Sequence, residues 1–131
     1  MRMRIRCLTC VLACMPIVTL AQEGHPMVGS WSGEWGPSPN DRMPVLVVLE
    51  WKARTITGVI NPGYPDEAPI QGTLDSSKWF VRLEAASKDE RGNPLKVVIE
   101  GTLDNIPSHN RTLTGTMSRG DLKAAIKLTR E

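Results

Sequence analysis

Apolar and polar residues alternate along most of this chain with a period of two. In several short stretches every second residue is Val, Ile, Leu, Trp or Ala, and the residues between them are mostly polar. This alternation is typical of antiparallel β-strands that bury one face and expose the other. It predicts strands over 29–35, 45–51, 54–60, 70–75, 79–85, 95–100, 111–118 and 122–129.

Turn-forming residues separate the predicted strands, as at 61–63, 75–77, 87–92 and 119–120. No stretch has a clear helical period, and 122–128 fits a period of two better than a period of 3.6. Eight strands joined only by hairpins favour an all-β, up-and-down antiparallel barrel, because closure leaves no exposed edges. A two-sheet sandwich is the alternative, since its pattern in sequence is nearly the same.

A short internal echo places glycines on the inward face of the predicted strands. The segment 54–58 (RTITG) recurs at 111–115 as RTLTG, and 72–75 (GTLD) recurs at 101–104. Glycine inside a strand either allows a sharp bend or leaves room for a large side chain opposite. Both interpretations are compatible with a small barrel that contains four tryptophans.

The first 21 residues have the three parts of a cleavable secretory signal peptide. Three arginines precede an uncharged, mostly apolar run over 7–20, and the small residue Ala21 stands at the expected cleavage site. This predicts a secreted or periplasmic protein, with a short linker over 22–26 and one β-barrel domain over 27–131. Two alternatives remain, an uncleaved membrane anchor and lipidation at Cys14.

Removal of residues 1–21 would change the cysteine content and the formal charge of the chain. All three cysteines lie in this segment, so the mature chain would have no disulfide. Lys and Arg fall from 16 to 13 when the three arginines leave, against 14 acids, and the formal charge moves from +2 to −1. We therefore expect no nucleic-acid partner.

The segment 29–35 (GSWSGEW) opens the domain in a way that resembles the calycin-type barrels, the lipocalins and avidins. Gly29 and Trp31 match their Gly-x-Trp motif. The resemblance implies that Trp31 closes one end of the barrel against an arginine from a late strand, for which Arg119 and Arg130 are the candidates. The chain lacks the lipocalin disulfide and the polar biotin-binding pattern of avidins. It is also similar to short exported bacterial proteins with a Gly-x-Trp-x-Gly-x-Trp start.

Candidate catalytic and metal-ligating groups are few. His25 and His109 have no second ligand at metal-binding spacing, and no serine stands in a nucleophile-elbow motif. The acidic residues within the strands alternate outward, whereas catalysis normally requires a buried carboxylate with a shifted pKa. We expect neither an enzyme nor a cofactor.

Aromatic residues are the remaining candidates for a binding site. Trp51 and Trp79 fall on inward faces by parity, and Trp35 and Tyr64 lie near loops. One hypothesis is a small apolar ligand held at the barrel mouth by Trp35, Trp51, Tyr64 and Trp79. The alternative is a filled barrel that acts as an interaction, inhibitor or scaffold protein of the cell envelope. Its contact surface would then be the loops over 36–42 and 61–69.

Overall fold

The structure, a computed structural model, describes residues 25–89 and 91–131, which form eight strands. The predicted signal peptide and Cys14 lie outside the described residues. The strands are β1 (Gly29–Trp35), β2 (Met43–Lys52), β3 (Thr55–Ile60), β4 (Ala68–Asp75), β5 (Phe80–Lys88), β6 (Pro94–Asp104), β7 (Thr112–Arg119) and β8 (Leu122–Arg130).

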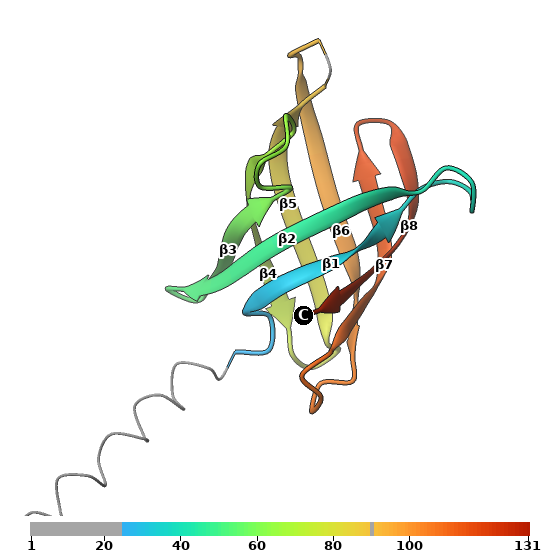
Figure 1. Cartoon of the computed structure of the whole chain (residues 1–131). Helices are drawn as coiled ribbons and strands as arrows, with labels where there is room; N and C mark the ends of the chain where they lie inside the picture. The colour runs from blue at the N-terminus through green and yellow to red at the C-terminus, as the bar shows by residue number, and fades with distance from the viewer. Residues whose placement is uncertain (1–24, 90) are drawn as a thin grey trace, which may run out of the picture.

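The eight strands form one closed antiparallel barrel in sequence order, so the predicted up-and-down barrel is confirmed and the sandwich is wrong (Figure 1). Closure comes from the pairing of β1 with β8, in which Trp31 lies opposite Arg130 and Trp35 lies opposite Ile126. Every strand therefore has a hydrogen-bonded neighbour on both sides.

The hairpin of β5 and β6 is longer than predicted. The polar residues after Ala85 continue the strand to Lys88, where Lys88 pairs with Pro94, and β6 runs on to Asp104. The added residues continue the alternation of buried and exposed positions, with Ser87 buried in β5 and Gly101 and Leu103 buried in β6, but glycine and serine at inward positions weaken the apolar signal in the sequence. At the other end of β5, Trp79 lies in the turn with a φ of 52° and is not part of the strand.

The barrel interior is filled by side chains. Twenty apolar residues of the described chain are buried, and all of them except Met27 alternate along the eight strands as a period of two requires. Trp31 and Trp35 are 0% and 2% exposed and lie on the same inward face of β1, with Gly33 between them. An eight-stranded barrel has an interior just wide enough for side chains, and here those side chains occupy it.

The inward glycines mark places where neighbouring strands approach closely. A Cβ atom built on Gly33 would lie 1.9 Å from the carbonyl oxygen of Lys127, and one on Gly58 would lie 1.9 Å from that of Val48. Backbone of the adjacent strand thus occupies the space that a side chain would need. Of the two interpretations of these glycines, the structure therefore supports the sharp bend and not room for a large side chain opposite.

The two ends of the barrel differ in what closes them. At one end, here called the N-terminal end, residues 25–28 enter the barrel beside the turns over 53–54, 76–79 and 105–111. At the opposite end, the loop end, lie the connections over 36–42, 61–67, 89–93 and 120–121. The predicted contact loops both belong to the loop end.

Gly33 gives a direct test of this close approach. We expect Gly33→Ala to lower the free energy of unfolding by about 3 kcal/mol, because the new methyl group would collide with backbone that cannot move freely. Gly63→Ala is the control: its φ is 87° but no atom lies within 4 Å of the added Cβ, so only about 1 kcal/mol of backbone strain is expected. Urea unfolding measures both, and equal losses would contradict the crowding at Gly33.

The turn between β2 and β3 has an unusual sequence for its conformation. Lys52 pairs with Thr55, which leaves a two-residue turn in which Ala53 and Arg54 have φ values of 50° and 74°. Turns with two positive φ angles strongly favour Asn-Gly, because a Cβ atom is strained in this region. The chain retains alanine and arginine there at a cost in stability.

Replacing this pair with the favoured residues should therefore stabilise the fold. We expect A53N combined with R54G to raise the free energy of unfolding by about 1 to 2 kcal/mol. Thermal and urea unfolding would measure the gain. The variant R54K is the control for substitution in the turn. It keeps both the backbone strain and the positive charge, so it should leave the free energy of unfolding unchanged. A double variant no more stable than the wild type would contradict the strain.

Candidate functional site

The four aromatic residues predicted to line a binding site lie at both ends of the barrel. Trp35 is 2% exposed within the core near the loop end, whereas Tyr64 is 61% exposed on the β3–β4 loop. Trp51 and Trp79 lie at the N-terminal end, where Trp51 is 44% exposed and Trp79 is half-buried against the core. The structure therefore does not bring the four together around one mouth.

The N-terminal end is closed by residues 25–28. Met27 is buried, and its carbonyl oxygen accepts a hydrogen bond of 3.0 Å from the Trp31 indole. Arg130 donates from Nε to the carbonyl oxygen of Val28 at 2.7 Å. Of the two arginines considered as partners of the first strand, Arg130 takes this position, while Arg119 lies at the loop end.

Further contacts hold this closure in place. Arg111 donates to the carbonyl oxygens of Ile106 at 2.7 Å and Pro26 at 3.3 Å. Desolvation, together with the nearby charge of Arg130, lowers the pKa of Arg111. Arg130 also donates from Nη1 to Nδ1 of His109 at 3.0 Å, since a guanidinium can only donate. The side chains of Arg111, Arg130 and His109 therefore stabilise the fold. Their hydrogen bonds go to the chain's own backbone or to one another, and not towards a ligand site.

His25 covers the exposed tryptophan of this end. Its ring stacks on Trp51 with centroids 4.0 Å apart and an angle of 12° between the planes. Its Nδ1 accepts a hydrogen bond of 3.2 Å from the backbone N–H of Met27. Trp51 continues the inward parity of β2 but lies beyond the buried layers, so its partner is the entering chain and not the core.

An open groove of about 450 Å³ crosses the outer wall of the barrel at β1 and β2. We call it the Tyr64 groove. It is lined by Ser32, Gly33, Met43, Pro44, Val45, Leu46, Asn61, Tyr64, Asp66 and Glu131. Ser32 and Leu46 pair across the two strands and face outward, and Glu131 accepts a hydrogen bond from the Ser32 hydroxyl. The groove thus combines an apolar floor with two carboxylates.

The loop that carries Tyr64 is fixed by hydrogen bonds. Asn61 extends the pairing of β2 with β3, because its N–H donates to the Leu46 carbonyl at 2.7 Å and its Oδ1 accepts from the Leu46 N–H at 3.1 Å. Asn61 also donates to Asp66 at 3.0 Å, and the hydroxyl of buried Ser87 donates to the Asp66 carbonyl at 3.0 Å. Tyr64 is therefore an exposed aromatic side chain on a pre-organised loop.

Met43, Pro44 and Leu46 are groove residues that the sequence patterns did not single out. The signal for them is the run over 43–49 (MPVLVVL), which contains no polar residue. A strand at a half-exposed barrel wall should be polar on its outer face, so apolar residues on both faces indicate an outer contact. On the outer face of this run Val48 is 36% exposed, whereas Met43 has inward parity and is 43% exposed because it lies at the loop end of the strand.

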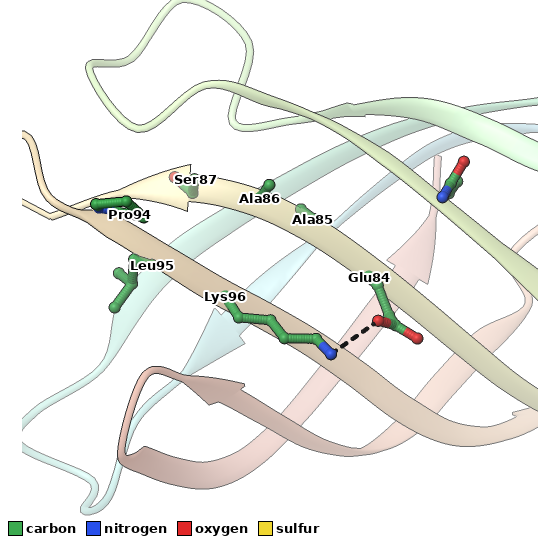
Figure 2. Close-up of a pocket in the computed structure, with 8 residues that line it drawn as sticks. Glu84, Ala85, Ala86, Ser87, Pro94, Leu95 and Lys96 are labelled. Atoms are coloured by element: carbon green, nitrogen blue, oxygen red, sulfur yellow. Dashed lines mark ion pairs between the residues drawn. The ribbon is translucent and has the colours of Figure 1, made fainter.

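A second hollow, of about 510 Å³, lies over β5 and β6 (Figure 2). Its small residues Ala85 and Ala86 leave room beside the Lys96 side chain, whose ammonium group forms an ion pair of 3.1 Å with Glu84. Hydrogen bonds from Lys96 and then Arg82 lower the pKa of Glu84. The charges lining this hollow neutralise each other, so it offers a ligand less to recognise than the Tyr64 groove does.

Within the described residues, no group of three or more His, Cys, Asp and Glu side chains is placed to hold a metal ion. Among the same residues, no helix is long and apolar enough to cross a membrane.

The His25 contact predicts a pH dependence at the N-terminal end. Burial lowers the pKa of His25 below its ordinary value of 6.5. The neutral ring is favoured by folding, so its contribution to stability is complete above pH 6.5 and is lost as the pH falls through the lowered folded-state pKa. An NMR titration of the His25 ring should give a midpoint below 6.5, and a value near 6.5 in urea.

Trp51→Ser serves as the matched variant, because it uncovers the His25 ring without altering its hydrogen bond to Met27. The midpoint should then move up towards 6.5. A folded wild-type midpoint at or above 6.5 would contradict the burial of this ring.

Comparison with known proteins finds no relative of this chain. Neither a protein-family model nor a curated protein nor a solved structure matches the chain.

Proposed function

We propose that this is a non-enzymatic, exported binding protein whose filled barrel acts as a scaffold for contacts on its outer surface. A partner protein would bind at the Tyr64 groove and the adjoining loops of the loop end. The observation that carries the proposal is the distribution of apolar side chains: the interior is packed, while Met43, Leu46 and Tyr64 line an open groove.

Tyr64 is the proposed anchor of the contact. Exposed tyrosines on rigid supports are frequent hot spots in protein interfaces, since they bury a large ring and lose little conformational entropy. The hydrogen bonds of Asn61 and Asp66 reduce the cost of ordering this loop on binding. A flexible loop would have to be ordered first, at the expense of affinity.

The closed barrel also limits how a partner would bind. Every described strand is paired on both sides, so no strand edge is free for a peptide to add to the sheet. Recognition would therefore depend on side chains of the groove. This favours apolar anchors and charged neighbours over backbone pairing.

Site-specific photo-crosslinking tests the proposal. A photoreactive phenylalanine at position 64, in the chain expressed with its own leader in its native host, should give one dominant cross-linked protein. Position 80 is the control, because Phe80 is 38% exposed on the outer wall near the opposite end. The proposal fails if position 64 gives no protein adduct, or the same adducts as position 80.

A small apolar ligand in the same groove is the second candidate. The volume of about 450 Å³ lies within the range of about 300–1,000 Å³ that is typical of ligand pockets. Native mass spectrometry of the purified protein would distinguish the two. A retained small molecule that Tyr64→Ala releases, together with no cross-linked protein, would favour the ligand.

A further inference from the structure

Charged residues of the connecting segments are divided between the two ends of the barrel. The turns of the N-terminal end contain Arg54, Lys78 and Arg111, and the acids of this end, Asp75 and Asp104, stand at the ends of strands beside the turns. The connections of the loop end contain Arg42 and Arg91 against the acids Asp41, Asp66, Glu67, Asp89 and Asp121, and Lys88 and Arg119 end the strands beside them. Formal net charge alone, near zero for the mature chain, hides this separation.

The acidic character extends into the Tyr64 groove. Asp66 and Glu131 line it, and none of its ten lining residues is Lys or Arg. Asp66 uses Oδ2 to accept from Asn61, and Glu131 uses Oε2 to accept from Ser32, so each carboxylate keeps a second oxygen that can accept further bonds. Both carboxylates border the apolar floor of Met43, Pro44 and Leu46.

Within the described residues neither Asp66 nor Glu131 forms an ion pair, and Lys88 and Arg119 line a separate hollow with Asp66. The Arg42 guanidinium donates to the carbonyl oxygens of Gly36 at 3.0 Å and Glu34 at 2.9 Å. It is thereby held along the chain's own backbone at the β1–β2 loop. The groove is left with an apolar floor and negative borders.

We propose that the Tyr64 groove binds a cationic amphipathic segment of a partner protein. An apolar side chain of the segment lies against Met43, Pro44 and Tyr64, and a lysine or arginine next to it lies beside Asp66 or Glu131. The inference rests on the proposed function and names the chemistry of the partner. Its basis is charge complementarity at an apolar groove, in a barrel that offers no strand edge.

Three short capped peptides labelled with a fluorophore test this chemistry against the full mature protein. One alternates leucine and lysine, the second replaces lysine with glutamate, and the third replaces leucine with serine. Fluorescence anisotropy at low salt should show binding of the leucine-lysine peptide alone. Raising the salt concentration should weaken it, because these charges are exposed to solvent.

Variants locate the binding. We expect Asp66→Asn combined with Glu131→Gln to weaken the leucine-lysine peptide about five-fold, as expected for two exposed ion pairs. Tyr64→Ala should weaken it at least as much by removing the apolar contact. Asp104→Asn, an acid at the N-terminal end, is the control and should leave the affinity unchanged.

Each other outcome overturns the inference in a defined way. Equal binding of the glutamate peptide would exclude charge recognition, and equal binding of the serine peptide would exclude the apolar floor. No peptide binding, together with a specific cross-link at position 64, would leave the proposed function intact and reject the cationic partner. Concentration-dependent dimers that Tyr64→Ala abolishes in analytical ultracentrifugation would assign the groove to a second copy of the chain.

Discussion

Closure of eight strands around a narrow interior is the constraint on which the other features of this molecule depend. The barrel closes through the pairing of β1 with β8, and strands must bend sharply to complete the circle. At Gly33 and Gly58, the adjacent strand lies where a side chain would begin. Most of the remaining inward positions hold apolar side chains, the largest being Trp31 and Trp35, which are 0% and 2% exposed. Bent backbone and side chains together use up the interior.

Because the interior is packed, a partner or ligand would have to bind to the outer surface of the barrel. A wall strand in water is normally apolar on one face only, yet β2 carries Pro44, Leu46 and Val48 on its outer face. Exposed apolar groups of this kind do not contribute to the core and favour association. The nearby Asn61 takes the place of a strand residue, and in doing so fixes the loop that brings Tyr64 over the same wall. Folding and the proposed contact thus share one hydrogen-bonding residue.

The sequence was sufficient to predict the barrel, because the period of two is a local property that each strand carries by itself. It also named Arg130 as one of two candidates beside the first strand, and only the register of β8 against β1 decides between Arg130 and Arg119. The groove was not predicted, although the unbroken apolar run over 43–49 is a signal for it, because parity assigns a residue to a face and gives no depth. Trp51 has inward parity and is 44% exposed, because β2 extends past the buried layers. Tyr64 belongs to a loop, where no period applies.

The shape of the groove bears on which kind of partner suits it. Ligand pockets usually surround most of a small molecule, because affinity depends on removing most of its surface from water. The Tyr64 groove lies on the convex wall of a barrel, bordered by the loop over 61–67 on one side and by Glu131 on the other. A small ligand there would stay partly in water. A segment of a folded partner is different, because the rest of the partner covers the side of the segment that faces away from the groove. The acids of the loop end would also orient a cationic surface before contact. The same exposed geometry that would weaken a small-molecule site therefore suits a protein interface.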